Sequence, residues 1–161
     1  MNRPENVIDI FLQPGDFYWG DSGTRIRTIL GSCISICMWH PVKLEGGMCH
    51  YMLPTRGDRR PKGELDGKYA DEAWELFRKE INRLGTKPSE YVTKLFGGAS
   101  MFQGKGNVLS MKMGDKNIEI ARNIIRTNSL NVVSENLGGI QSRRIHFEIW
   151  SGNVWLKRHE G

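Results

Sequence analysis

The chain has 161 residues, of which 39% are hydrophobic and 25% charged. This composition excludes collagen-like, fibrous and wholly disordered proteins, and the length predicts a single domain spanning residues 1–161. The net charge of +5 is compatible with a nucleic acid, an anionic membrane or an acidic protein as the partner. The positive charges are spread along the chain. The densest basic patches are Arg56-Arg59-Arg60-Lys62, Arg143-Arg144 and Lys157-Arg158, and most such patches are solvated surface.

No stretch approaches the roughly 18 consecutive apolar residues of a membrane span. Residues 1–17 carry three acidic side chains and lack the pattern of a signal peptide. We therefore expect a cytoplasmic protein with no membrane insertion. The three cysteines are an odd number and do not form a disulfide framework, so free thiols are expected.

Strand patterns dominate the first third of the chain. Alternation in a β-branched-rich run predicts a strand over residues 34–39, and a short apolar run predicts a second strand over 48–53. A turn through residues 41–47 would make them neighbours. Residues 54–68 combine glycine, proline and charge, which predicts a long surface loop, and such loops are often functional.

Apolar residues at 3.6-residue spacing predict a helix over residues 69–84, with Gly85 as its C-terminal cap. A second helix is predicted over residues 116–126. Further strands are predicted at residues 91–96, 132–133, 144–150 and 154–158. Strands and helices mixed in this order predict one α/β or α+β domain.

Cys33 is the strongest candidate nucleophile. It follows Gly31 and Ser32 where a predicted loop enters a strand, a position that can expose a thiol and still hold its backbone rigidly. A neighbouring imidazole would lower the pKa of the thiol and later protonate a leaving group. His50 is the best imidazole, because opposed residues of antiparallel strands lie about 5 Å apart. The alternative is that Cys33 is a small buried residue and His50 a core histidine.

The remaining cysteines and histidines are less promising. Cys37 and Cys49 are expected to be packing residues, and His40 is expected on the surface in a turn. A zinc set of Cys33, Cys37, Cys49 and His50 is a weaker alternative, because Cys49 and His50 would point to opposite faces of a strand. We therefore expect no metal.

Small residues follow the strand predicted at 91–96, in the motif FGGASM at residues 96–101. The amides of such a turn can cradle an anion or an oxyanion. Gly98 and Ser100, together with Gly31 and Ser32 beside the thiol, are therefore candidates for contacting substrate or an oxyanion. No phosphate-binding signature follows, so a nucleotide site is weakly supported, and a purely structural turn is the alternative.

These motifs resemble those of the CheD family of chemoreceptor glutamine deamidases. The matching segments are LGSC at 30–33, GGMCHYMLP at 46–54, KYAD at 68–71 and FGGASM at 96–101. The similarity continues through Gly138-Gly139 and Arg143 to the hairpin around Ser151-Gly152. It covers nearly the whole chain, from about Thr28 to Lys157, and four ordered motifs at consistent spacing are specific.

The resemblance implies a protein-glutamine glutaminase, an amidohydrolase with a cysteine nucleophile that takes part in chemotaxis adaptation. Cys33 matches the family nucleophile and His50 the general base. Thr28, the only threonine just upstream of the Gly-Ser-Cys turn, is the residue to which the third catalytic position is carried over. The implied reaction releases ammonia through a Cys thioester and leaves glutamate. It requires no metal or organic cofactor.

The resemblance also implies a layered sandwich of mixed β-sheets with flanking helices, a cysteine-hydrolase fold shared with certain deamidating toxins. The implied partners are chemoreceptor cytoplasmic helices as substrate and, in some members, a CheC-type phosphatase. An alternative function is that of a non-catalytic regulatory partner of the phosphatase or of receptors. Nucleic-acid binding is not expected, because no zinc-finger, helix-turn-helix or RNA-stacking signature is present.

Overall fold

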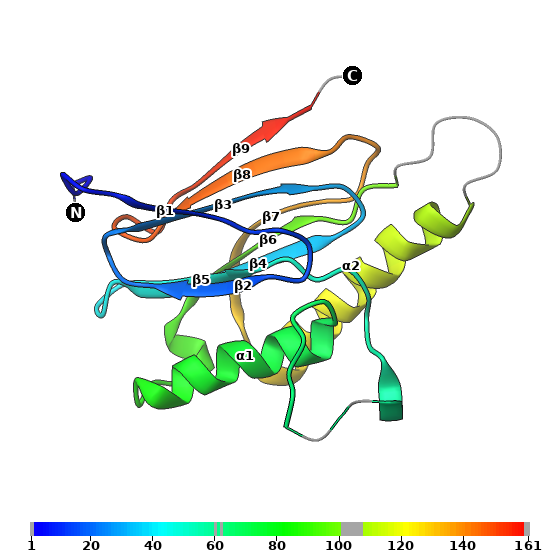
Figure 1. The fold of residues 1–161 in the computed structure, drawn as a ribbon, viewed down its shortest axis with the longest axis horizontal. Coiled ribbons are helices and arrows are strands. Elements are labelled where there is room, and N and C mark those ends of the chain that lie inside the picture. Colours follow the sequence, from blue (N-terminus) through cyan, green and yellow to red (C-terminus); the bar gives the residue numbers. More distant parts are fainter. Residues whose placement is uncertain (1, 60, 62, 101–107, 160–161) are drawn as a thin grey trace.

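A computed structural model describes residues 2–59, 61, 63–100 and 108–159. The elements form three layers, with a four-stranded sheet, a five-stranded sheet and two helices that cover the outer face of the second sheet (Figure 1). Each sheet contains both parallel and antiparallel pairs. The prediction of mixed β-sheets with flanking helices is therefore confirmed.

The first sheet has the strand order β1-β3-β8-β9. Its members are β1 (Ile8–Phe11), β3 (Thr24–Leu30), β8 (Arg143–Glu148) and β9 (Val154–Arg158). Along β3 and β8, buried side chains alternate with more exposed ones. This period of two is what a sheet with one buried and one solvated face requires.

The second sheet has the order β2-β5-β4-β6-β7. Its members are β2 (Phe17–Gly20), β5 (Glu45–Cys49), β4 (Ile34–His40), β6 (Val92–Gly97) and β7 (Asn131–Leu137). Strand β4 lies at the centre, and every residue of it except Trp39 is buried. The strand is therefore covered on both faces, by the first sheet on one side and by the helices on the other.

Two helices form the third layer, α1 (Ala70–Arg83) and α2 (Val108–Asn128). Helix α1 turns one apolar stripe toward the sheet, and Gly85 follows it at φ +67°, the left-handed conformation expected of a C-terminal cap. Two short 3₁₀ helices lie at Gly57–Arg59 and Pro88–Glu90. Within the described residues, no helix is both long and apolar enough to cross a membrane.

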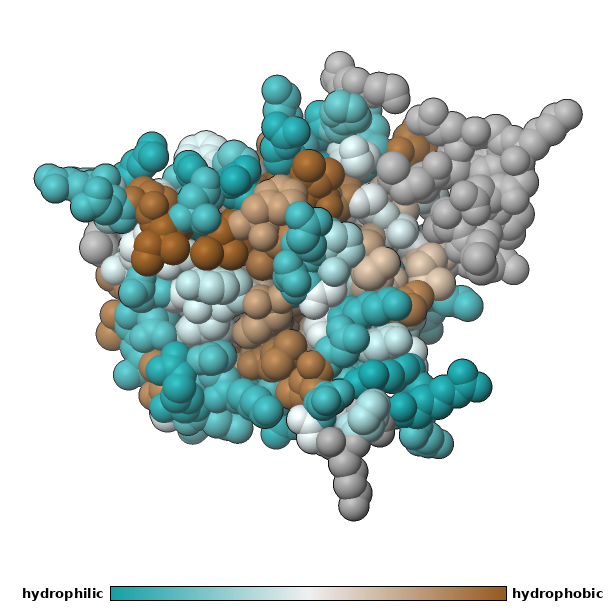
Figure 2. All heavy atoms as spheres, in the orientation of Figure 1, coloured by the Kyte–Doolittle hydropathy of each residue, from teal (hydrophilic) through white to brown (hydrophobic). Residues whose placement is uncertain are grey.

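The two interfaces between the layers hold separate hydrophobic cores. Between the sheets lie, among others, Leu12, Ile26, Cys37, Phe96 and Ile145. Between the second sheet and the helices lie, among others, Ile36, Cys49, Tyr51, Phe77 and Ala121. Figure 2 shows hydrophobic side chains gathered at the level of the sheets and mostly hydrophilic ones over the helix at the bottom.

Several predicted boundaries were wrong. The second strand was predicted at residues 48–53, but β5 covers Glu45–Cys49 and includes Gly46 and Gly47. A side chain on either glycine would overlap a neighbouring strand, so the glycines permit close strand packing instead of forming a turn. Strand β7 and helix α2 are longer than predicted, and β1, β2 and β3 were not predicted as separate strands.

The prediction that His40 lies on the surface was also wrong, because the residue is buried. Its Nδ1 accepts hydrogen bonds from the backbone N–H groups of Val42 and Lys43. Its ring also packs edge-on against Tyr91. The histidine thus holds the β4–β5 turn from inside.

Candidate active site

Cys33 lies where the chain crosses from one sheet to the other. Strand β3 of the first sheet ends at Leu30, and β4 of the second sheet begins at Ile34. The intervening Gly-Ser-Cys link spans both sheets in three residues. Cys33 is a half-buried free thiol that packs against the edge of the core between the sheets. Its backbone is therefore fixed by two strands while part of the side chain reaches solvent.

The link carrying Cys33 is held by the turn that follows β6. The N–H of Gly98 donates to the carbonyl oxygen of Cys33 at 2.9 Å, and the N–H of Ala99 donates to that of Gly31 at 3.0 Å. Gly97 and Gly98 have φ angles of +114° and +70°, and a Cβ on Gly97 would overlap the Cys33 carbonyl oxygen. Glycine is required here because two backbones meet in a left-handed conformation.

Helix α2 supplies a second support for the link. The side-chain Nδ2 of the fully buried Asn117 donates to the carbonyl oxygens of Ser32 at 3.0 Å and Met52 at 2.9 Å. Ser32 precedes the candidate nucleophile, and Met52 lies two residues after His50. One amide therefore ties together the two segments that carry the candidate dyad. Its Oδ1 is buried and has no hydrogen-bond partner among the described residues.

His50 follows directly after β5 and faces the same region as Cys33. Ile34 and Tyr51 exchange both backbone hydrogen bonds as an antiparallel pair, at 3.0 and 3.1 Å. Cys33 precedes the first of these residues and His50 the second, so the two side chains are diagonal neighbours on one side of the pair. Diagonal neighbours have Cβ atoms roughly 7 Å apart, which a histidine can span. The sequence predicts that Cys33 and His50 lie directly opposite each other, whereas in the structure they are offset by two positions.

Thr28, on β3, fixes the orientation of the His50 ring. Its hydroxyl donates to the carbonyl oxygen of Leu12 at 2.8 Å and lies 2.7 Å from Nδ1 of His50. Because the single hydroxyl hydrogen is used on Leu12, the second contact requires Nδ1–H as the donor. The imidazole therefore carries its proton on Nδ1, and Nε2 is left with a free lone pair. This arrangement suits a general base.

Burial sets the protonation states of the candidate dyad. It lowers the pKa of His50 to about 4, against a smaller opposing effect of Asp16. It raises the pKa of Cys33 to about 11. At pH 7 both groups are therefore neutral, with a thiol that needs a base and an imidazole that can accept a proton. No hydrogen bond joins the thiol to the imidazole in the part of the chain that the structure describes, and such contacts often tighten only when substrate binds.

The four residues predicted to contact substrate or an oxyanion fall into two groups. The N–H groups of Gly98 and Ser100 donate to the carbonyls of Cys33 and Gly139, so neither amide is free for an oxyanion. The other two, Gly31 and Ser32, lie in the link itself. The carbonyl of Gly31 accepts from Ala99, whereas the N–H groups of Ser32 and of Cys33 donate to no acceptor within the described residues. They lie beside the thiol, where an oxyanion would form. Met101, which ends the predicted motif, lies outside the described residues.

The alternative zinc set is not assembled. Cys37 lies in the core between the sheets, whereas Cys49 lies in the core beneath the helices. The two thiols are therefore on opposite faces of the second sheet, as expected for packing residues. Among the described residues, no group of three or more His, Cys, Asp or Glu is placed to hold a metal ion.

Two contributors were not identified from the sequence. Leu12 acts only through its backbone carbonyl, which no sequence pattern predicts. Asn117 could have been recognised from the sequence, because it lies four residues before Ala121 and seven before Ile124, on the buried stripe of α2. A polar residue on an apolar stripe is unusual enough to indicate a specific hydrogen-bonding role.

Comparisons with known proteins give the same family as the sequence motifs. The family described as "CheD chemotactic sensory transduction" matches residues 52–158 of the chain. A protein of Dechloromonas aromatica (strain RCB), named "Probable chemoreceptor glutamine deamidase CheD 3", is 46% identical over 98% of this chain and 92% of its own length. A protein of Leptospira interrogans serovar copenhageni, named "Probable chemoreceptor glutamine deamidase CheD 1", is 48% identical over 98% of this chain and 97% of its own length.

The two kinds of match cover different parts of the chain. The family match begins at residue 52, after both Cys33 and His50. The pairwise similarities extend over nearly the whole chain and therefore include the segment that carries these residues. A third relative, from Albidiferax ferrireducens, is 44% identical over 96% of this chain and 90% of its own length.

Proposed function

This chain belongs to the CheD family, and we propose that it deamidates glutamine side chains of chemoreceptors with Cys33 as the nucleophile. In this proposal His50 is the general base and Thr28 is the residue that orients it. The observation that carries the assignment is the Thr28–His50 contact of 2.7 Å, which leaves Nε2 unprotonated on the side of the ring away from Thr28.

The first half of the reaction releases ammonia. Nε2 of His50 takes the proton of the Cys33 thiol, and the thiolate sulfur attacks the side-chain carbonyl carbon of the glutamine. The negative charge on the carbonyl oxygen is held by the amides of Ser32 and Cys33, and one such donor is worth about 3 kcal/mol of barrier. The carbon–nitrogen bond then breaks, and the leaving nitrogen takes the proton from His50 and departs as ammonia.

The second half restores the enzyme. The acyl group is now a thioester on Cys33, and a water molecule attacks its carbonyl carbon while giving a proton to His50. The carbon–sulfur bond breaks, and the thiolate takes the proton back from His50. The substrate side chain leaves as a carboxylic acid that ionises to glutamate, and the overall reaction consumes one water molecule and releases one ammonia molecule. No metal or organic cofactor enters these steps.

The proposal also covers the domain organisation and the cellular compartment. We propose that residues 1–161 form one domain that works in the cytoplasm, where a free thiol stays reduced. We also propose a CheC-type phosphatase as a partner, which co-elution of the two purified proteins would test. A solely regulatory role predicts binding of receptors without release of ammonia.

Ammonia release from a purified chemoreceptor cytoplasmic fragment tests the catalytic assignment. Wild type is expected to release ammonia, and Cys33→Ala and His50→Ala are each expected to abolish the release. Cys37→Ala is a matched control, because it removes a buried thiol from the same hydrophobic core. Release that persists in Cys33→Ala, or that is lost equally in a folded Cys37→Ala, would refute the role given to Cys33.

A further inference from the structure

The outer face of the first sheet is not covered by either helix (Figure 1). Strand pairing places three rows of side chains across this face. The first row contains Asp9, Arg25 and Glu148, the second contains Phe11, Arg27, His146 and Trp155, and the third contains Ile29, Arg144 and Lys157. Phe11, Ile29 and Trp155 are exposed large hydrophobic residues, at 40%, 46% and 61% of their surface. The face thus combines basic and apolar side chains in the open.

Charge is balanced on only part of this face. Near β1, the carboxylate of Asp9 forms ion pairs with Arg25 at 3.1 Å and with Arg27 at 2.8 Å. Arg144 and Lys157 lie directly opposite each other on β8 and β9, and neither forms an ion pair within the described residues. Like charges directly opposite each other on neighbouring strands destabilise a sheet. An anion bound between them would relieve this repulsion.

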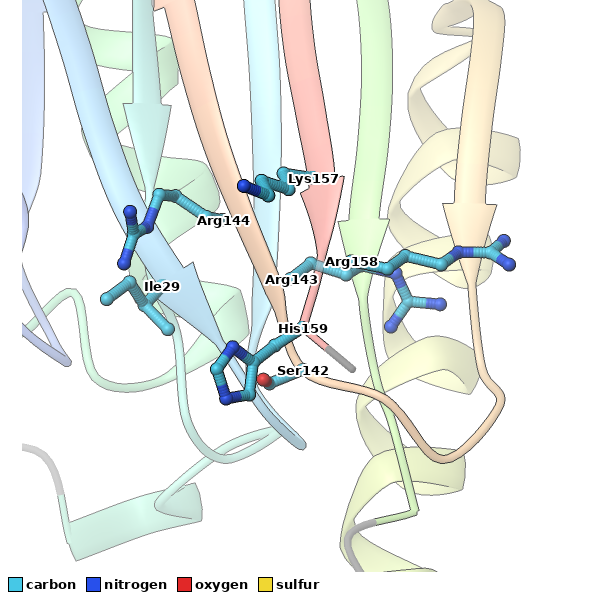
Figure 3. A pocket seen from close by; sticks show the side chains of 7 residues that line it. All are labelled: Ile29, Ser142, Arg143, Arg144, Lys157, Arg158 and His159. Carbon is cyan, nitrogen blue, oxygen red and sulfur yellow. The ribbon is translucent and has the colours of Figure 1, made fainter. Parts of the chain in front are cut away.

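Arg144 and Lys157 line a groove of about 510 Å³, together with Ile29, Ser142, Arg143, Arg158 and His159. Figure 3 shows Arg144 and Lys157 on the same side of the sheet as Ile29, whereas Arg143 and Arg158 point to the other side. The buried Arg143 is held by Asn136 and by the carbonyl of Gly138, so its charge serves the fold. Arg144 and Lys157 are exposed. These two charges remain available to a partner.

The groove lies at the same end of the sheet as the candidate nucleophile. Ile29 precedes Cys33 by four residues, which span at most about 14 Å of chain. That distance corresponds to about four residues of an extended substrate or about nine residues of a helix. A carboxylate within that range of the target glutamine can therefore reach the groove while the glutamine reaches the thiol.

We propose that the groove of Ile29, Arg144 and Lys157 is the docking site for an acidic segment of the protein substrate that flanks the target glutamine. This docking site rests on the proposed function and would determine which glutamines of the substrate are deamidated. Carboxylates of the substrate bind the two cations, and its apolar side chains cover the exposed Ile29.

Two variants and a matched control test the proposal on the chemoreceptor cytoplasmic fragment. R144E/K157E is expected to raise KM about tenfold with little change in kcat, since it reverses the charge of the docking site and leaves the thiol untouched. K157E alone is expected to raise KM and also to raise Tm, because it puts opposite charges across the β8–β9 pair. R78E/K79E makes the same change in net charge on the exposed side of α1 and is expected to leave KM unchanged.

Binding measured apart from turnover separates this proposal from the catalytic one. Fluorescence anisotropy of the labelled fragment with the Cys33→Ala chain reports docking even if no ammonia is ever released. Unchanged binding in R144E/K157E, or an equal loss in R78E/K79E, would overturn the docking site. Duplex DNA that binds at about 0.15 M salt through Arg144 and Lys157, while the fragment does not depend on them, would overturn it in favour of a nucleic acid.

Discussion

Substitution of Thr28 by valine isolates the orienting role of its hydroxyl. Valine has nearly the same shape and also suits a strand, so β3 and the packing around position 28 are preserved. Only two contacts are lost, the donation to the Leu12 carbonyl at 2.8 Å and the acceptance from Nδ1 of His50 at 2.7 Å. Both contacts are buried.

The expected fall in kcat of Thr28→Val follows from the cost of an unpaired hydrogen-bond donor. Without the threonine hydroxyl, the buried Nδ1–H of His50 has no acceptor, which costs about 1–3 kcal/mol. The imidazole can avoid this cost by moving its proton to Nε2 or by rotating away. Either change removes the free lone pair on Nε2 or its orientation. Restoring the productive arrangement therefore costs the same free energy. We therefore expect kcat to fall roughly 5- to 150-fold. Thr28→Ser keeps the hydroxyl and is expected to recover most of the rate.

Initial rates of ammonia release from the receptor fragment give kcat, and urea unfolding monitors stability in parallel. Thr93→Val is the matched control, since Thr93 is also a fully buried strand threonine but its hydroxyl has no hydrogen-bond partner among the described residues. Its kcat is expected to equal that of wild type. A Thr28→Val variant with wild-type kcat and KM would refute the orienting role.

Two further expectations concern the supports of the site and its dependence on pH. Asn117→Ala leaves the carbonyls of Ser32 and Met52 without their donor. We expect the unfolding free energy to fall by about 2 kcal/mol and kcat to fall about tenfold. Asn123→Ala, on the exposed side of α2, is the control and is expected to change neither quantity appreciably. For His50, the folded pKa of about 4 lies below the ordinary 6.5, so the unfolded chain binds the proton first as the pH falls between these values. Stability is expected to drop by about 3 kcal/mol across that window, and urea unfolding at pH 7 and pH 4.5 should show a smaller drop in His50→Gln.

Much of the fold follows from local patterns in the sequence. Helix α1 was predicted within one residue at each end, because its apolar stripe and Gly85 cap are local signals. Strand β9 was predicted at its exact bounds. Strands β1 and β2 are only four residues long, and their pairing depends on distant partners. Short strands of this kind carry too little periodicity to be recognised locally.

The candidate site shows the same division between local and distant determinants. The Gly-Ser-Cys link indicated Cys33, since its glycine and its place before a strand are local features. The partners of the dyad could not be read in this way. Thr28 lies on the other sheet from His50, and their contact exists only because the chain crosses between sheets at Cys33. The sequence offered Gly98 as a candidate for contacting an oxyanion, with a structural turn as the alternative. Its N–H donates to the Cys33 carbonyl, an acceptor that is distant in sequence.

Conversion of receptor glutamine to glutamate by Cys33 can be followed by mass spectrometry. A chemoreceptor cytoplasmic fragment is incubated in parallel with wild type and with Cys33→Ala. Specific glutamines are expected to gain the mass of a glutamine-to-glutamate change with wild type only. Conversion of the same glutamines by Cys33→Ala, or no conversion by wild type, would contradict the role given to Cys33.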